Sequence, residues 1–263
     1  MIGIFDSGVG GLTVVREIFK ILPDYQIVYF GDTAHLPYGT KSKEAVCRYS
    51  LANAQFLLNQ GAKIIVIACH TASSLAVDTL RKKFPKIPIF DVVKPGIKQA
   101  LEVTKNKKIG IIGTSSTIRS EAHKKALLSL NQEVEVFSQA CPLLVPLVEE
   151  GWINRSETRR IVKYYLRHLK QKQIDTLILA CTHYPLLENL ISSIAGRRVT
   201  LVDPAREVAK ELKEFLEKNK DIAQTLKKGK DHKFFVSDVP YKFGELSRRC
   251  LGRVVKVEQI RIE

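Results

Sequence analysis

The feature that most restricts the fold of this chain is the regular alternation of short apolar runs with longer amphipathic stretches. Runs of this length that are rich in Val and Ile are typical of strands buried on both faces in parallel sheets. Helical patterns lie between them, for example one that begins near Leu12 and one over 43–61 that ends in a glycine. The sequence therefore predicts an α/β fold with mainly parallel sheets flanked by helices. The predicted strands are 2–5, 26–30, 63–68, 87–90, 108–113, 134–138, 176–180, 199–202, 234–237 and 254–260.

One short motif occurs twice, and this repetition favours two similar domains over a single wide sheet. "VIACHTAS" covers 66–73 and "ILACTHYP" covers 178–185, and each leads from apolar residues into a cysteine with a Thr and a His close behind it. We predict a first domain formed by 1–94 and 207–263 and a second, pseudosymmetric domain formed by 95–206, with a crossing near the Pro and Gly of "DVVKPG". Ligands of such folds bind beyond the carboxyl ends of the strands. The active site is therefore expected in the cleft between the domains.

Composition and charge narrow the class of protein further. The chain is 45% hydrophobic and 26% charged, as globular proteins are, and no apolar stretch is long enough to span a bilayer. The N-terminus has no basic region of the kind that opens a signal peptide, so we expect a cytoplasmic protein that does not bind membranes. The 42 Lys and Arg exceed the 27 Asp and Glu and give a formal charge of +15. These cations are spread along the chain without interleaved aromatics, which favours attraction of small anions over specific nucleic-acid binding.

The first predicted strand runs into "IFDSGVGG" (4–11), a glycine-rich turn that precedes a helical pattern. Glycines at such a turn let backbone N–H groups approach an anion. A dinucleotide site is one reading, supported by Asp32 after the second strand, but Thr13 stands where that fingerprint has its last glycine. Because the charge of Asp6 would repel a phosphate, we interpret its carboxylate as a base or as a group that orients one.

Five cysteines are present, and their odd number and scattered spacing argue against a disulfide framework. Cys47, Cys141 and Cys250 are interpreted as small core residues. The repeated cysteines, Cys69 and Cys181, each end an apolar run, and this matched position indicates a chemical role.

Three chemistries could use the repeated cysteines. A thiol–disulfide couple would lack the usual C-x-x-C spacing. A zinc site could take Cys69, His70, Cys181 and His183, but these do not have the usual ligand spacing. In the third chemistry, two thiols face one carbon from opposite sides, so that one removes a proton while the other delivers one. Such a site needs fixed donors for the developing negative charge. The candidates are Ser7, Thr71, Thr114, Thr117 and Thr182.

Six segments, in order, resemble the signature segments of the glutamate racemase family, within the aspartate/glutamate racemase superfamily. They are "FDSGVGGLTV", "YFGDTAHLPYG", "ACHTAS", "GIIGTSSTIRS", "CPLLVPLVEEG" and "CTHYPLL". The similarity runs from residue 2 to about 206, with a weaker match around "FFVSDVPYKFGELSRRCLG". The resemblance implies interconversion of L- and D-glutamate without pyridoxal phosphate or metal, and D-glutamate supplied to peptidoglycan synthesis. Homodimers are common in the family, and the oligomeric state of this chain stays open.

The resemblance also implies the residues of the site. Cys69 and Cys181 match the catalytic cysteines, Asp6 matches the carboxylate beside the first, and Glu149 and His183 match the groups that assist the second. The neighbouring Glu150 leaves the assignment of Glu149 open by one position. The positions that match substrate-binding residues are Asp6, Ser7, Tyr38, Gly39, Thr71, Thr182 and His183, and the predicted binding site adds His70, Thr114 and Thr117.

Four residues depart from the family pattern: His70 replaces the usual Asn, His35 an Arg, Lys94 a Glu, and His123 a common Tyr. An Asn amide both donates and accepts, whereas a neutral imidazole does each from a fixed nitrogen. If His70 were protonated, its charge would favour the thiolate of Cys69. The departures leave open a racemase of aspartate or of another amino acid. The net charge leaves open a weakly active homologue that acts as a binding protein of the gyrase-inhibitor type.

Overall fold

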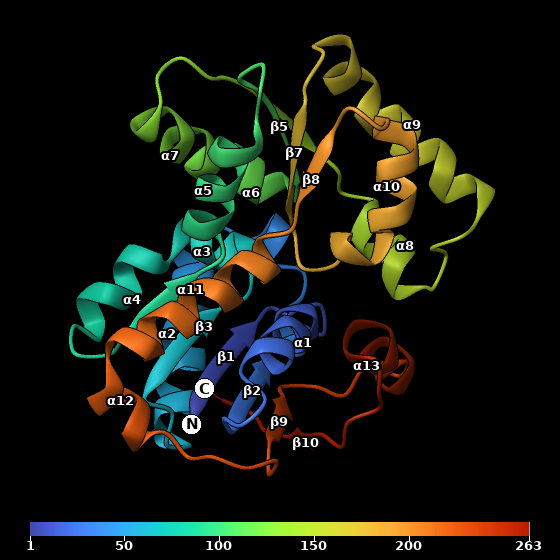
Figure 1. The fold of residues 1–263 in the computed structure, drawn as a ribbon. Helices are drawn as coiled ribbons and strands as arrows, with labels where there is room; N and C mark the ends of the chain where they lie inside the picture. Colours follow the sequence, from blue (N-terminus) through green and yellow to red (C-terminus); the bar gives the residue numbers. More distant parts are fainter. Residues whose placement is uncertain (263) are drawn as a thin grey trace.

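The computed structural model describes residues 1–262 and contains two parallel β-sheets, each covered by helices on both faces (Figure 1). The first sheet has the strand order β10-β9-β2-β1-β3-β4 and the second β6-β5-β7-β8. This confirms the predicted fold class. The strands of the first sheet are β1 (Ile2–Asp6), β2 (Ile27–Gly31), β3 (Ile64–Ile67), β4 (Ile89–Asp91), β9 (Lys233–Val236) and β10 (Glu258–Gln259), and those of the second are β5 (Lys108–Gly113), β6 (Glu135–Ala140), β7 (Thr176–Ala180) and β8 (Thr200–Val202).

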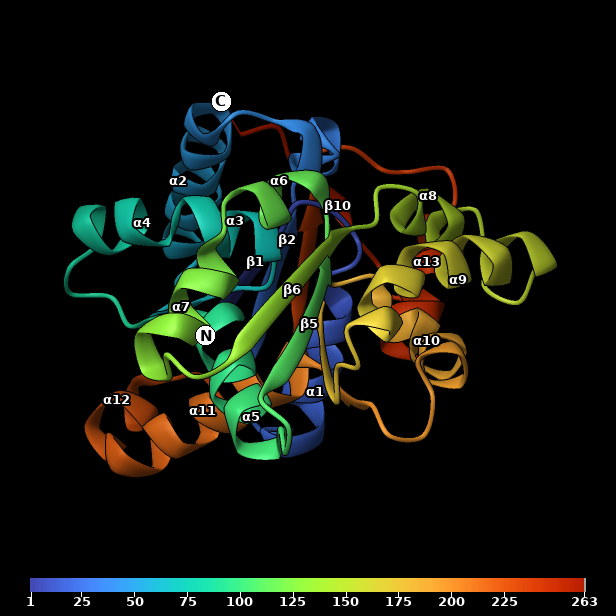
Figure 2. The same ribbon diagram turned by 90° about the horizontal axis from the view of Figure 1, so that it is seen from above.

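The two sheets repeat one topology. The order β2-β1-β3-β4 in the first sheet is the order β6-β5-β7-β8 in the second, and all these pairings are parallel. In each set the third strand of the sequence, β3 or β7, leads directly into the repeated cysteine motif. Figure 2 looks down on the second sheet, with β5 and β6 in front of β1 and β2. The repetition therefore places Cys69 and Cys181 at corresponding ends of the two sheets.

Alternating side chains of each strand enter separate cores, as buried parallel strands require. Ile2 and Ile4 of β1 pack against one layer of helices, and Phe5 packs on the opposite face. Every residue of β1, β2, β3 and β7 is buried. The helices of the first layer are α1 (Leu12–Ile21), α11 (Pro204–Lys218) and α13 (Phe243–Leu251), and those of the opposite layer include α2 (Lys43–Asn59), α3 (His70–Leu75) and α4 (Val77–Lys83).

The second sheet is covered in the same way. Ile112, Leu177 and Leu179 face one helical layer, and Ile109 and Ile178 face the other. One layer is formed by α8 (Leu144–Glu149), α9 (Ser156–Gln171) and α10 (Glu188–Ala195), and the other by α5 (Val93–Val103) and α7 (Ala122–Leu130), with α6 (Ser115–Arg119) between β5 and α7. Within residues 1–262, no helix combines the length and apolar character that a membrane crossing requires.

The chain crosses between the sheets twice, through α5 after β4 and through α11 after β8. The boundaries suggested by the sequence, after residues 94 and 206, fall inside these two helices. After α11 and α12 (Lys220–Thr225) the chain returns to the first sheet, where β9 pairs with β2. The predicted strand 254–260 is largely wrong, because only Glu258 and Gln259 pair as β10. This strand lies at the edge of the sheet, and within residues 1–262 no further strand pairs with its outer side.

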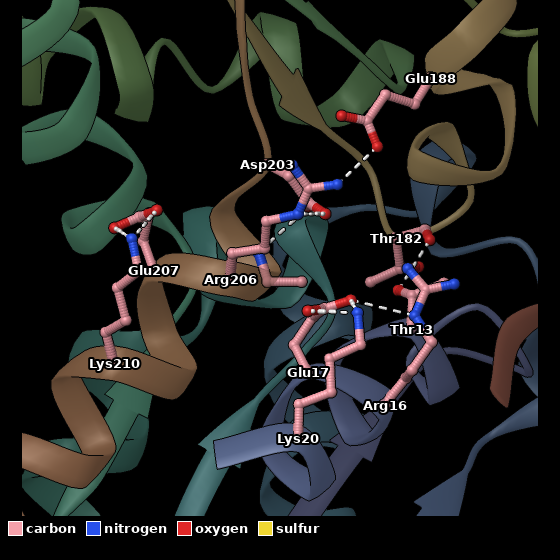
Figure 3. A network of polar contacts seen from close by, with 11 residues as sticks. Thr13, Arg16, Glu17, Lys20, Thr182, Glu188, Asp203, Arg206, Glu207 and Lys210 are labelled. Carbon is pink, nitrogen blue, oxygen red and sulfur yellow. Dashed lines mark hydrogen bonds and ion pairs between the residues drawn. The ribbon is translucent and has the colours of Figure 1, made fainter.

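A network of polar contacts lies at the second crossing and on α1 (Figure 3). Arg206, in the first turn of α11, lies 2.6 Å from Glu188 of α10 and 3.6 Å from the buried Asp203. On α1, the Thr13 hydroxyl lies 3.0 Å from the carbonyl oxygen of Thr182, which follows β7. Burial raises the pKa of Asp203 to about 6, partly offset by the N–H of Ala205 and the charge of Arg206. The network therefore holds α11 against the second sheet and α1 against the end of β7.

The two halves approach each other closely at Gly39. It lies in η2 (Tyr38–Thr40), and the Ser116 hydroxyl donates a 2.8 Å hydrogen bond to its carbonyl oxygen. A Cβ atom at position 39 would lie 2.7 Å from Cβ of Thr114. Glycine is therefore required here by contact between the halves.

We predict that Gly39→Ala lowers the free energy of unfolding by about 1–3 kcal/mol, because the added methyl group overpacks the contact with Thr114. Chemical denaturation in urea measures the change. Gly244→Ala is the matched control, since nothing lies within 4 Å of a Cβ at that position in α13. Equal effects of the two substitutions would show that the contact at Gly39 is not restrictive.

Candidate active site

The carboxyl ends of β3 and β7 meet at one small cavity, and both repeated cysteines line it. Cys69 is 5% exposed and precedes α3, and Cys181 is 6% exposed and follows β7. Of the predicted site residues, Ser7, Tyr38, Gly39, Cys69, His70, Thr71, Thr114, Cys181, Thr182 and His183 line the cavity. Four further lining residues were not predicted: Leu36, Pro37, Val145 and Ala180.

The cavity is much smaller than a ligand pocket. Its volume is about 30 Å³, below the range of roughly 300–1,000 Å³ that is typical of ligand pockets. A pocket for an amino acid needs more room than this, so the surrounding elements must move apart to admit one. Because the lining comes from both sheets, the described arrangement is a closed one.

Asp6 lies behind Cys69 at the end of β1 and is fully buried. Its Oδ2 accepts hydrogen bonds from the N–H groups of Gly8 at 3.1 Å and Gly11 at 2.9 Å. The anion seat predicted at the glycine-rich turn is therefore filled by the carboxylate of the protein itself, and the turn gives no support to a dinucleotide site. Burial raises the pKa of Asp6, although the charge of His183 and the backbone N–H groups partly oppose the rise.

The sulfur of Cys69 has an environment that favours its protonated form. Burial raises the pKa of this thiol to about 12, and the charge of Asp6 adds to the rise. Hydrogen bonds from the Ala72 backbone and from Ser7 oppose it only in part. At neutral pH Cys69 is therefore a thiol in the closed site.

Cys181 has the opposite kind of neighbour. Its Sγ lies 4.0 Å from Nδ1 of His183, and Nε2 of the same ring lies 3.1 Å from Oε1 of Glu149. Burial opposes a charge on His183, but the contacts with Cys181 and Glu149 outweigh it and raise the pKa of the imidazole to about 10. The adjacent Glu150 is exposed and pairs with Lys242, so the geometry selects Glu149 as the partner of His183.

Three hydroxyl groups form a triangle on the wall of the cavity. The Oγ1 atoms of Thr71, Thr114 and Thr117 lie 2.9–3.0 Å apart. Thr71 comes from α3 in the first half, and the other two come from the start of α6 in the second. Thr117 is buried behind Thr114 and does not line the cavity. The triangle can donate to an anionic group from both halves at once.

Tyr38 lines the cavity, but its hydroxyl is engaged elsewhere. It donates to Asp32 at 2.5 Å and accepts from Asn53 at 3.1 Å. Burial, with the charge of Asp32 and this hydrogen bond, raises the pKa of the Tyr38 phenol well above its usual value. Tyr38 therefore offers its ring and backbone to the cavity. No pattern in the sequence indicates that Asp32 has this supporting role.

The departures from the family pattern fall into two groups. His35 contacts Asp32 at 2.8 Å, Lys94 is exposed at the start of α5, and neither lines the cavity. His70 does line it, and its Nδ1 lies 3.3 Å from Nε2 of His123. Burial and the charge of His123 lower the pKa of His70 well below its usual value. His70 is thus neutral at physiological pH and cannot drive Cys69 towards the thiolate as a protonated ring would.

The described residues 1–262 contain no group of three or more His, Cys, Asp and Glu side chains placed to hold a metal ion. The zinc site that was one alternative for Cys69, His70, Cys181 and His183 therefore has no support from the geometry. All five cysteines are free.

Comparison with known proteins places these features in a family. The family described as Asp/Glu/Hydantoin racemase matches residues 2–212. A glutamate racemase of Geobacter metallireducens is 47% identical over 100% of this chain and 97% of its own length. The crystal structure of glutamate racemase isoform RacE1 from Bacillus anthracis superposes with a TM-score of 0.93 at 39% identity, covering 99% of this chain and 97% of that one. The glutamate racemase of Francisella tularensis, solved in complex with D-glutamate, has a TM-score of 0.91 at 36% identity, with 98% and 96% covered.

The contact between His183 and Glu149 leads to a prediction about pH. An imidazole whose pKa is raised from 6.5 to about 10 by folding contributes stability that is fully present below pH 6.5 and is lost as the pH rises through 10. Glu149→Gln removes a negative charge beside the ring, so we expect the pKa of His183 to fall and this loss of stability to begin at lower pH. Titration followed by NMR of the histidine ring signals measures the pKa directly.

Glu150→Gln is the control for this measurement, since Glu150 is the next residue and pairs with Lys242 on the surface. It should leave the pKa of His183 unchanged. If the pKa of His183 fell equally in both variants, the overall negative charge at the end of α8 would set it, and the direct contact with Glu149 would not.

Proposed function

The chain belongs to the Asp/Glu/hydantoin racemase family, and we propose that it interconverts L- and D-glutamate by a two-base reaction between Cys69 and Cys181. The observation that carries the proposal is that the two buried sulfurs, one from each sheet, line the same cavity. Inversion at a carbon by proton transfer needs a base on one face and an acid on the other. Matched cysteines at the ends of β3 and β7 meet that need.

The two sulfurs take opposed roles in the first half of the proposed cycle. Cys181, beside the imidazolium of His183, removes the α-proton from one face of glutamate. Cys69, whose pKa is raised to about 12, delivers its own proton to the opposite face. The α-carbon thereby inverts, Cys181 becomes a thiol, and Cys69 becomes a thiolate. In the reverse reaction, the Cys69 thiolate removes the α-proton of the new enantiomer and the Cys181 thiol delivers one.

Neighbouring groups support each sulfur differently. His183, tied to Glu149, stabilises negative charge on Cys181 before the proton is removed. On the other side, Ser7 and the N–H of Ala72 can stabilise the Cys69 thiolate once its proton has left. Asp6 lies beside Cys69 with a raised pKa and can take up or return a proton there.

The reaction also needs stabilisation of the charge that develops on the substrate. The α-carbon of an amino acid is a very weak acid, so donors that are already oriented lower the barrier. The triangle of Thr71, Thr114 and Thr117 supplies hydroxyl donors, and Ser7 and Thr182 lie on the same cavity or at its edge. The site uses no cofactor in this proposal. The closed geometry would exclude water from the reacting carbon.

The cellular role follows from the proposed product. D-glutamate would supply peptidoglycan synthesis, as the resemblance to glutamate racemases implies. A cytoplasmic location fits the five cysteines, which are all free. Growth of a D-glutamate auxotroph that carries this gene tests the role in cells.

The proposed activity is tested with purified protein, L-glutamate and no added cofactor. Circular dichroism of the substrate should decay to zero, since a racemase brings the two enantiomers to equal concentration. L-aspartate is assayed in parallel, and decay with aspartate alone would make the protein a racemase of the shorter dicarboxylate. No decay with either substrate would overturn the proposal.

Substitution of the cysteines separates the two half-reactions. We predict that Cys69→Ser and Cys181→Ser each lower the rate of racemisation by about 10²–10⁴ or more, because each removes an acid–base group. Each variant keeps one thiol and should still exchange the α-proton of one enantiomer for deuterium, with opposite enantiomers in the two variants. Mass spectrometry of each enantiomer after incubation in deuterium oxide measures the exchange.

Cys47→Ser serves as the control for these variants, because this half-buried cysteine donates to the Leu75 carbonyl oxygen and does not line the cavity. It should keep the wild-type rate. Full racemase activity in either Cys69→Ser or Cys181→Ser would refute the two-thiol mechanism.

A further inference from the structure

Two buried histidines join the halves of the molecule beside the reactive site. His70 begins α3 directly after Cys69, and His123 lies in the first turn of α7. Nδ1 of His70 lies 3.3 Å from Nε2 of His123, and the ring planes are within 22° of each other with centroids 5.5 Å apart. The rings are 4% and 3% exposed. The two nitrogens are therefore placed for one hydrogen bond, shielded from water.

Both rings are neutral. Burial lowers the pKa of His123 to about 4, and burial together with the neighbouring ring lowers the pKa of His70 still more clearly. A hydrogen bond between two neutral imidazoles contains one proton, and each ring has one proton to place. Only two arrangements meet these conditions. Either His70 donates from Nδ1 to His123, or His123 donates from Nε2 to His70.

The surroundings of His123 favour the second arrangement. In the described part of the chain, its Nδ1 is buried without a hydrogen-bond partner. If His70 were the donor, His123 would have to carry its own proton on that nitrogen, as a buried N–H without an acceptor. Orphaned N–H groups are the rarest unpaired groups in protein interiors. If His123 donates, both rings carry their proton on Nε2, which is also the more stable tautomer of neutral histidine in water.

This choice determines what His70 presents to the cavity. Its Nδ1 is occupied by His123, and the residue lines the cavity, so Nε2 is the nitrogen left for a ligand. We propose that His123 is a positioning residue that fixes the tautomer of His70, so that His70 presents a neutral N–H donor to a carboxylate of the bound amino acid. The identity of the ligand rests on the proposed function, whereas the tautomer of the pair does not.

The pair of histidines offers a hydrogen-bond donor without a positive charge, which would change the protonation of the neighbouring Cys69. An imidazolium next to Cys69 would favour its thiolate, and the first half of the proposed cycle needs this sulfur as a proton donor. A neutral donor can bind a carboxylate and leave the Cys69 thiol protonated. An Asn amide at position 70 could also accept from an ammonium group, but His70 in this tautomer cannot. The substrate ammonium group must therefore be held by other groups.

The tautomer can be measured on the unchanged protein without a ligand. ¹⁵N-histidine labelling and two-bond ¹H–¹⁵N correlation spectra at neutral pH distinguish protonated from bare ring nitrogens. His70→Gln and His123→Gln assign the signals among the six histidines. We expect Nε2 protonated and Nδ1 bare in both rings. A proton on Nδ1 of His70, or a charged ring, would overturn the proposal, whether or not the protein racemises glutamate.

Kinetics tests whether the pair acts on the ligand. His123→Phe keeps an aromatic ring but removes the donor, so we expect KM for glutamate to rise about 2- to 10-fold with a smaller change in kcat. His123→Gln retains an N–H at a similar distance and should restore most of the affinity. The exposed His168 supplies the control His168→Phe, which should leave KM unchanged.

The two measurements together are decisive. If His123→Phe does not fold, the spectra of the unchanged protein and the KM of His123→Gln still test the proposal. A wild-type KM in His123→Phe, with the tautomer of His70 unchanged, would show that His123 does not position the ring. An inactive wild-type protein with the expected tautomers would instead count against the proposed function alone.

Discussion

Exclusion of water from the contact between the two sheets is the constraint on which the chemistry of this protein depends. The sulfurs, the carboxylate of Asp6 and the rings of His70 and His183 are all at least nine-tenths buried. In such surroundings an ionisable group keeps its charge only where a partner compensates for lost hydration. Each protonation state in the site is therefore determined by contacts across or beside this interface. The same contact leaves a cavity of only about 30 Å³.

The repeated topology does not produce a symmetric site. Cys69 and Cys181 follow corresponding strands, yet one has a buried carboxylate behind it and the other has an imidazole backed by Glu149. Desolvation and like charge hold the first sulfur in its protonated form, whereas a cation lies beside the second. The pseudosymmetric fold supplies the opposed positions, and the residues that differ between the halves give each sulfur a different environment. A racemase needs both properties.

Much of this arrangement could be predicted from the sequence, because strand-end residues of parallel sheets gather at one edge. The motifs around Cys69 and Cys181 predicted a shared cleft, and both residues line one cavity. Other features depend on contacts that no local pattern encodes. His70 and His123 are 53 positions apart and come from different halves, so their neutrality could not be derived from either segment. The glycine-rich turn predicted a seat for an anion, but only the folded backbone shows that Asp6 occupies it. Residues 254–260 have the composition of a strand, but pairing of β10 stops after two residues at the edge of the sheet.

The order in which the sheets are completed during synthesis follows from the two crossings of the chain. All strands of the second sheet lie within 108–202 and leave the ribosome as one continuous stretch. The first sheet is interrupted by this whole stretch, and β9, which pairs with β2, is made only afterwards. Until residues 233–236 emerge, β2 is an edge strand whose backbone groups are open to other chains. A polypeptide that stops short of this point would have an intact second sheet beside a first sheet with an exposed edge strand. Such an incomplete product is prone to aggregation.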